Sequence, residues 1–329
     1  MADAVLLQFE CRLTAAEGED MKPKKKKMGA RAAERRKLLL ISIPFLLFIT
    51  AFCYVPLAGW VISFFEYYPG IPLNKLEFVG LKNFEFFFYN KRQVLNVLRN
   101  TFVLSGLIII TLPLPAVFAI LLNEIRSVKF KKAVQTFSTI PYFISYVLLN
   151  LALVTILSPS DGMLNTLLYN KLGLIDEPLN VLNNDKIAWT VQTCVYLFKN
   201  MGYSAILYLS AIAGIDPQLY EAAEVDGAGR FAKIWNITVP GLLSTFVVLL
   251  VLGLGNALSG AGFEQYYVFG NAMVLDKLEV IDTYTYKMGI VQGNYAFGTA
   301  MSMMKSVLSV GLLLIANFIV KRIRGASIF

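Results

Sequence analysis

Residues 216–240 read DPQLYEAAEVDGAGRFAKIWNITVP and form a polar interval between two long apolar runs. Asp216 followed by Pro217 predicts a helix start, because Asp caps free backbone N–H groups and Pro at the first helical position loses no hydrogen bond. We expect this helix to reach about Asp226. Gly227 then provides the backbone freedom that a turn requires.

A second short helix is expected directly after this turn. It carries Phe231, Ile234 and Trp235 at a spacing that places them on one face. The simplest interpretation is a solvated helical hairpin between two membrane spans. However, an exposed apolar face in water requires a partner that covers it, so the interval is a candidate docking surface.

The rest of the chain has the composition of a membrane protein. Of its 329 residues, 57% are hydrophobic and 16% are charged, and the mean hydropathy is +0.60; a soluble domain has about 25% charged residues. About 20 apolar residues are needed to cross a bilayer as a helix. Six runs meet this length, and they predict an all-α, polytopic membrane protein. The predicted spans are residues 38–65, 101–122, 137–157, 187–212, 240–259 and 299–320.

The distribution of basic residues predicts the orientation of these spans. Ten Lys and Arg residues precede Leu38. A nucleic-acid-binding tail is one interpretation, but a basic run directly before a span is typical of a topology signal that contacts anionic lipid. The positive-inside rule places both termini and residues 216–240 in the cytoplasm. We therefore predict a cytoplasmic basic tail, residues 1–37, and a six-span membrane domain, residues 38–329.

The chain lacks the residues that several kinds of catalytic, metal and ATP-binding site require. It contains no histidine, which excludes Ser-His-Asp triads and HExxH zinc sites, and it has no GxxxxGK[ST] loop to hold ATP. Cys11, Cys53 and Cys194 are far apart, so neither a disulfide framework nor a metal site is indicated. We predict no catalytic site, and an energy source on another chain or in an ion gradient.

The central stretch also resembles a known motif. Glu221-Ala222-Ala223, then Gly227, Ile237 and Val239-Pro240, have the spacing of the EAA loop of ABC importer permeases, the family of the maltose permeases. Val239 stands where that family usually has Leu, a change that keeps an apolar contact. The resemblance implies a type I ABC importer permease fold, with this loop as a coupling helix that docks in a groove of an ATPase subunit. The coupling residues that it implies are Glu221, Ala222, Ala223, Asp226, Gly227 and Phe231.

The same resemblance implies a set of partners. A permease of this family pairs with a second homologous permease, two ATPase subunits and an extracytoplasmic solute-binding protein in the bacterial cytoplasmic membrane. ATP and Mg would be bound by the ATPase subunits, and the permease itself would need no cofactor. Its mechanism would be alternating access without covalent chemistry.

Further motifs resemble the branch that imports oligosaccharides from complex polysaccharides, including alginate and pectin-derived substrates. Tyr142 departs from that branch, which often has His at this position. The motifs that carry this resemblance are Tyr54-Val55-Pro56, residues 78–84 (FVGLKNF), residues 121–126 (LLNEIR), Val134-Gln135-Thr136, Pro141 with Phe143-Ile144-Ser145, residues 157–160 (LSPS), Phe263-Glu264-Gln265 and Asp282-Thr283-Tyr284.

Two lysines lie within the predicted spans, Lys199 in the fourth and Lys305 in the sixth. No Asp or Glu lies within the six spans, so we expect these ammonium groups to reach the membrane surface, contact a partner chain or line a wet path. A cationic path would favour an acidic sugar. The candidate path residues are Lys199, Asn200, Tyr203, Asn256 and Lys305, although polar residues in spans more often bond to neighbouring helices.

Other classes of membrane protein are less compatible with the sequence. An ion-coupled secondary transporter is the main alternative, but such folds usually show internal repeats and intramembrane carboxylates or histidines. A membrane enzyme needs a nucleophile with a base or paired acids, and the spans contain neither carboxylates nor histidine. A voltage-gated channel is disfavoured because there is no Arg-rich helix or TVGYG filter.

Overall fold

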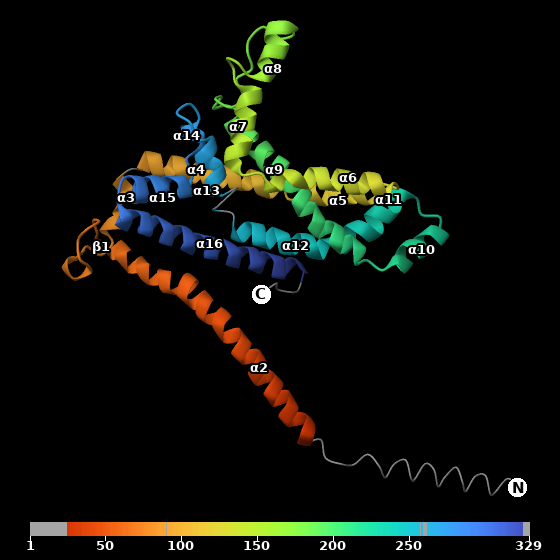
Figure 1. The fold of residues 1–329 in the computed structure, drawn as a ribbon, viewed down its shortest axis with the longest axis horizontal. Coiled ribbons are helices and arrows are strands. Elements are labelled where there is room, and N and C mark those ends of the chain that lie inside the picture. The colour runs from red at the N-terminus through yellow and green to blue at the C-terminus, as the bar shows by residue number, and fades with distance from the viewer. Residues whose placement is uncertain (1–24, 90, 257, 259–261, 325–329) are drawn as a thin grey trace, which may run out of the picture. The chain divides into compact units, whose positions relative to one another are not determined.

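The computed structural model describes residues 25–89, 91–256, 258 and 262–324, and most of them are helical (Figure 1). The chain divides into two compact units between Gly59 and Trp60. The predicted all-α class is confirmed, with one small two-stranded sheet added. Most of the basic tail, residues 1–24 with Cys11, lies outside the described residues.

The first apolar run forms a continuous helical stretch with changing geometry. It consists of α2 (Lys25–Ile49), the π-helical segment η1 (Thr50–Tyr54) and the 3₁₀-helical segment η2 (Val55–Phe64). The change occurs just before Pro56, which has no N–H to donate. Val55 N–H bonds to the carbonyl of Thr50, five residues back, so the helix widens locally instead of stopping.

The second predicted span is longer than expected and is divided into two helices next to Pro113. Helix α4 (Lys91–Thr111) begins ten residues before the predicted start, and α5 (Pro113–Asn123) follows it after Leu112. Pro113 occupies the first turn of α5, where its missing N–H is not needed. Together α4 and α5 are long and apolar enough to cross a membrane.

The third predicted span is not a continuous helix, which corrects the expectation for residues 137–157. Helix α6 (Val128–Thr139) and the 3₁₀ turn η4 (Ile140–Phe143) end at an extended residue, Ile144, and α7 (Tyr146–Leu157) begins after it. The two halves meet at a bend of 104°. The Ser145 hydroxyl caps the new helix by accepting from Leu148 N–H at 3.3 Å, so the sequence specifies a restart that hydropathy conceals.

The predicted count of six spans is not confirmed among the described residues. Four helices are long and apolar enough to span a bilayer, and the bent pair makes a fifth if it counts as one span. The predicted fourth span forms the 26-residue helix α9 (Ala188–Ala213), but polar residues such as Lys199 and Asn200 lower its hydropathy. The predicted fifth and sixth spans correspond to α12 (Val239–Gly255) and α16 (Tyr295–Arg324).

The segments between the spans contain a pair of short strands and several short helices. Strands β1 (Phe65–Glu66) and β2 (Glu77–Phe78) pair in antiparallel fashion, with Phe65 opposite Phe78. The other connecting elements are η3 (Leu73–Lys75), α3 (Lys82–Tyr89), α8 (Met163–Asn165), η5 (Thr166–Lys171), α13 (Phe263–Phe269), α14 (Leu275–Leu278), α15 (Ile281–Tyr286) and η8 (Lys287–Val291).

The second unit has its core where α9 crosses its neighbours. Ala119 of α5 is buried there beside Ala205, Tyr208 and Ile212 of α9 and Leu242 of α12. Other buried clusters join α7 to α9 and α13, and α4 to α15 and α16. Helix α9 is therefore packed on several sides, which fixes its position within the unit.

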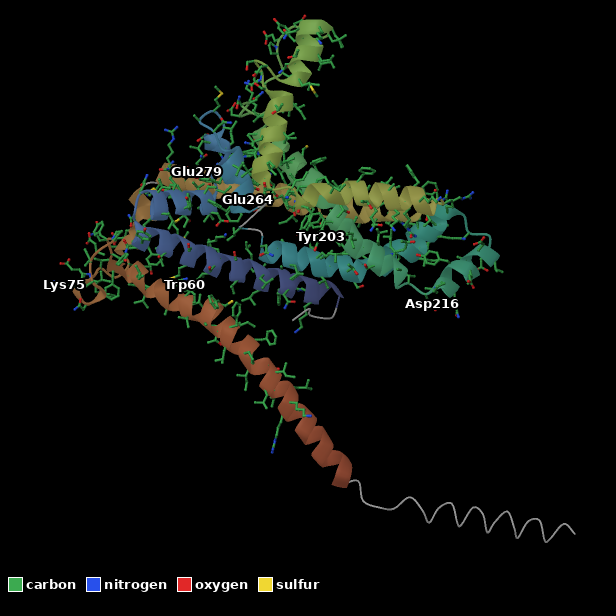
Figure 2. The ribbon with its side chains drawn as sticks, viewed as in Figure 1. Trp60, Lys75, Tyr203, Asp216, Glu264 and Glu279 are labelled. Carbon is green, nitrogen blue, oxygen red and sulfur yellow. The ribbon has the colours of Figure 1, made fainter. Side chains whose placement is uncertain are left out.

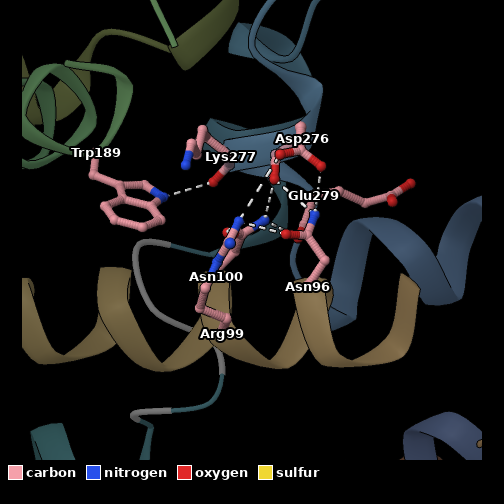
Figure 3. A network of polar contacts seen from close by, with 7 residues as sticks. All are labelled: Asn96, Arg99, Asn100, Trp189, Asp276, Lys277 and Glu279. Atoms are coloured by element: carbon pink, nitrogen blue, oxygen red, sulfur yellow. Dashed lines mark hydrogen bonds and ion pairs between the residues drawn. The ribbon is translucent and has the colours of Figure 1, made fainter. Parts of the chain in front are cut away.

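A buried amide attaches α4 to the helices that follow α13 (Figure 3). Asn100 is fully buried, and its Nδ2 donates to the carbonyls of Asp276 at 2.8 Å and Glu279 at 3.1 Å. The indole N–H of Trp189 donates to the carbonyl of Lys277 at 2.9 Å. These bonds satisfy carbonyls around the short helix α14, and they hold it against α4 and α9.

Candidate functional site

The central stretch forms two helices joined by a glycine turn, as its sequence predicts. The Asp216 carboxylate accepts from Gln218 N–H at 2.9 Å and caps α10 (Pro217–Val225). Ala228 N–H then bonds to the Ala223 carbonyl at 2.8 Å across Gly227, whose φ is +76°. This left-handed conformation favours glycine. The second part is α11 (Arg230–Lys233), which continues through the π-helical η6 (Ile234–Thr238) into α12.

The apolar side chains of this stretch are uncovered within the chain. Phe231 is 88% exposed and Trp235 73% exposed, while Ile234 is half-buried. Val225, at the end of α10, is 89% exposed; it was not predicted because it does not share the spacing of Phe231, Ile234 and Trp235. Of the other predicted coupling residues, Ala223 is half-buried and the exposed ones are Glu221, Ala222, Asp226 and Gly227.

Polar contacts fix the position of this stretch. Lys233 Nζ lies 2.8 Å from Glu224 Oε2, and Tyr220 shares a hydrogen bond of 2.9 Å with Thr238. The hydrogen bond from Lys233 lowers the pKa of the Glu224 carboxyl below its ordinary value. Arg230 bonds outside the stretch: its Nε lies 3.0 Å from Glu124 Oε2, and its Nη2 donates to the Glu124 carbonyl at 2.9 Å. The loop is thereby tied to the end of α5.

Lys199 lies at the break between α6 and α7. Its ammonium donates to the carbonyls of Tyr142, at 2.8 Å, and Ile144. The same nitrogen lies 4.8 Å from the centre of the Tyr146 ring and 5.8 Å from that of Tyr142. The residue is 9% exposed, so the cation is buried among carbonyl dipoles and aromatic rings.

The uncharged path candidates are distributed along α9 and at the end of α12. Tyr203, labelled in Figure 2, is half exposed. Its ring stacks on that of Tyr142, with ring centres 3.9 Å apart. Asn200 donates to the Tyr196 carbonyl and lines a cavity of about 100 Å³ between α5, α9 and α12. Asn256 is exposed and bonds back to its own helix at 3.1 Å, so the structure does not bring it to the same cavity.

Lys305 corrects our expectation that the intramembrane lysines have no partner within the chain. Its Nζ lies 2.5 Å from Asp282 Oδ1, and the two side chains are only 19% and 20% exposed. We did not consider this pairing because Asp282 lies outside the predicted spans. Helix α15 packs against α16 and brings the carboxylate to the lysine.

A wide cleft of about 1030 Å³ lies where α4 begins, and it was not predicted from the sequence. Its charged side chains include Asp276 and Glu279, and Lys287 Nζ lies 3.0 Å from Glu279 Oε1. Arg99 contacts Asn96 and lies 3.9 Å from Asp276 (Figure 3). The available signal was the basic run in residues 91–99. The cationic residues that line this cleft are Lys91, Arg92, Arg99 and Lys287.

Comparison with known proteins identifies the relatives of this chain. Residues 116–325 match the model of the family described as binding-protein-dependent transport system inner membrane component. The chain is 36% identical to Protein LplB of Bacillus subtilis, over 89% of this chain and 91% of that protein. It is 37% identical to the polygalacturonan/rhamnogalacturonan transport system permease protein YteP of the same organism, over 94% and 95% of the two chains.

Solved structures agree with these relatives. The chain is similar to a subunit of a bacterial ABC transporter involved in the import of the acidic polysaccharide alginate, with a TM-score of 0.78 and 31% identity. The match covers 91% of this chain and 99% of that one. A structure of the bacterial alginate transporter in complex with a periplasmic protein that holds an alginate pentasaccharide gives a TM-score of 0.80. This chain thus belongs to the binding-protein-dependent transport system inner membrane component family, as an oligosaccharide-uptake permease of the ABC transporters and not an enzyme.

Proposed function

We propose that this permease carries acidic oligosaccharides, of the alginate or pectin-derived type, through the cytoplasmic membrane by alternating access. Two relatives support this substrate class: one is named for polygalacturonan and rhamnogalacturonan, and one solved neighbour imports an acidic polysaccharide. The buried Lys199 supports it physically, because none of the ion pairs among the described residues involves it. A buried positive charge that is held by carbonyl dipoles and not by an ion pair favours anionic cargo in a low-dielectric region.

The observation that carries the proposal is the uncovered apolar surface of residues 216–240. Val225, Phe231 and Trp235 are more than 70% exposed on a glycine-jointed pair of helices. We assign this surface to docking on an ATPase subunit, with Glu221, Ala222, Ala223, Asp226 and Gly227 forming its polar and small-residue part. ATP and Mg then bind to the two ATPase subunits, and this chain binds neither.

The remaining partners and the topology follow from the same proposal. A second homologous permease completes the path, and a solute-binding protein outside delivers the sugar. The basic tail of residues 1–37, the loop and the C-terminus face the cytoplasm, and residues 38–329 form the permease domain. Of the proposed path residues, Lys199 and Lys305 have their ammonium groups bonded within the chain. We therefore assign direct sugar contact to Tyr203, whose ring is half exposed, and keep Asn200 and Asn256 as proposed path residues.

The test is transport by the complete complex in proteoliposomes. ATP inside the vesicles should drive accumulation of uronate oligomers, and neutral oligomers of equal length should accumulate poorly. Equal uptake of neutral and acidic oligomers would overturn the substrate class. Uptake driven by an ion gradient without the ATPase subunits would instead favour a secondary transporter.

A variant of the loop tests the coupling role. Glu221→Lys reverses an exposed charge on α10 and should abolish ATP-driven uptake while the protein still inserts into the membrane. Lys129→Glu, a charge reversal at an exposed position of α6, is the matched control. Normal transport by the Glu221 variant would show that residues 216–240 are only a connector.

A further inference from the structure

One face of α9 holds the break in the bent pair α6–α7. Lys199, Gly202 and Tyr203 are three and four residues apart, so they lie on the same side of the helix. All three contact residues in the range 138–146, which runs from the end of α6 through η4 to the start of α7. Three different kinds of contact therefore converge on one bend.

The first contact satisfies backbone groups that the break leaves without helical partners. Ile144 is extended, with φ −80° and ψ 130°, and so is Ser145. The carbonyls at the end of a helix lack N–H partners and carry partial negative charge, and an unsatisfied carbonyl in a membrane is costly. The Lys199 ammonium supplies donors to two such carbonyls.

The second and third contacts bring α9 directly against the end of α6 and against η4. A Cβ at Gly202 would lie 2.1 Å from the carbonyl oxygen of Ser138 and 2.8 Å from Thr139 N. No side chain fits there, so the backbones touch. One residue further, the Tyr203 ring lies parallel to that of Tyr142, within 5°. The bent pair is thus held by charge, by backbone packing and by ring stacking.

Helix α9 leads directly into the loop of residues 216–240. Only Gly214, Ile215 and Asp216 separate α9 from α10, and the N–H groups of the first two bond back to the last turn of α9. Figure 2 labels Tyr203 and Asp216 on this stretch. A Cβ at Gly241 would lie 2.6 Å from the end of the Ile215 side chain. The connection is therefore short and closely packed, and we expect a displacement of α10 to move α9 with it.

We infer that the Lys199, Gly202 and Tyr203 face of α9 is the joint through which motion of the loop reaches the bent pair α6–α7. Lys199 is a positioning residue in this joint: its ammonium holds the carbonyls of Tyr142 and Ile144, so that α7 moves with α9 as one body. This role rests on the docking of residues 216–240 proposed above. It requires a buried cation at the bend whether the cargo is acidic or neutral.

The test measures the distance between α7 and α9 in the complete transporter. Spin labels replace Leu151 and Leu207, both exposed, in a background in which Cys11, Cys53 and Cys194 are alanine. The parent should give one narrow distance in the nucleotide-free and the ATP-trapped states. Lys199→Met keeps the length of the side chain and removes its charge. In this variant the distance distribution should broaden or split. The equilibrium constant between the held and the released form of the joint should shift toward the released form by about tenfold or more, because hydrogen bonds to a charged group are lost.

Functional measurements separate this joint from other roles. In the Lys199→Met complex, ATP hydrolysis should continue while uptake per ATP falls for every sugar that is carried. Phe198→Leu, on the exposed side of α9, is the matched control and should behave as the parent. Tyr203→Leu removes the stacked ring and leaves every charge in place; the α7 to α9 distance in this variant, and not its uptake, provides the test if the Lys199 variant does not assemble.

Two results would overturn the inference. One is a Lys199→Met complex that keeps the narrow parental distance in both states. The other is a parent whose α7 to α9 distance changes between the states, because the two helices would then not move as one body. Either result can occur in a complex whose parent shows ATP-driven uptake, so the joint can fail while the proposed function stands. A parent without ATP-driven uptake would overturn the proposed function instead.

Discussion

Lys305 Nζ lies 2.5 Å from Asp282 Oδ1, and this contact joins α16 to α15 with both side chains about four-fifths buried. A buried ion pair costs desolvation free energy in forming, but removing one partner leaves a buried charge without compensation. The free energy of unfolding should therefore fall most when only one of the two residues is replaced.

We expect Lys305→Met and Asp282→Asn each to lower the free energy of unfolding by about 3 kcal/mol. The double variant should recover much of this loss, because it leaves no unpaired charge. Thermal unfolding of the purified protein in detergent checks the cycle. Additive losses in the double variant would show that the two groups do not stabilise each other.

The turn at Gly227 gives a graded prediction. Its φ of +76° is unfavourable for residues with a side chain, although a Cβ there would meet nothing within 4 Å. The cost of substitution is therefore conformational and not steric. Gly227→Asn should be tolerated best, Gly227→Ala should cost about 1 kcal/mol, and Gly227→Pro should be worst because proline fixes φ near −65°.

ATP-driven uptake by the three Gly227 variants measures this order directly. All three should insert into the membrane in parental amounts, because the residue is exposed and lies between spans. Equal transport by the Pro and Asn variants would show that the left-handed turn is not needed for coupling.

These variants also mark what the sequence could and could not predict. The Asp216 cap, the Gly227 turn and the uncovered Phe231 and Trp235 depend on neighbouring residues, and all four were predictable. The break at Ile144 was not predicted, because hydropathy averages over the extended residues and the Ser145 cap. Hydropathy measures how apolar a segment is, and it does not detect where its backbone changes direction.

Long-range pairings were missed for a different reason. Lys305 and Asp282 are 23 positions apart, and Arg230 and Glu124 are 106 apart. Arg230 has several acids in its own loop, and the packing of the chain brings Glu124, at the end of α5, to it instead. One sequence contains no information that selects such partners among several acids of equal charge.

The contact between Lys233 and Glu224 predicts a pH dependence in the loop. The hydrogen bond from Lys233 lowers the pKa of Glu224, so its stabilising contribution is complete above the ordinary carboxyl pKa and is lost as the pH falls through the lowered value. Lys233→Met should return the pKa of Glu224 toward its ordinary value. NMR titration with ¹³C-labelled glutamate measures this shift, and Glu224→Gln identifies the signal. An unchanged pKa in the Lys233 variant would contradict the assigned cause.

Replacing Arg230 should cost more stability than replacing its partner Glu124. Arg230 makes two bonds to Glu124, one to the carboxylate and one to the backbone carbonyl. Glu124→Gln removes only the ionic part, and an exposed ion pair contributes about 0.2 to 1 kcal/mol. Arg230→Ala removes both bonds and frees the start of α11 from α5. We therefore expect Arg230→Ala to reduce the thermal stability of the assembled transporter and its uptake per ATP more than Glu124→Gln does. Equal losses in the two variants would show that the ion pair alone attaches the loop.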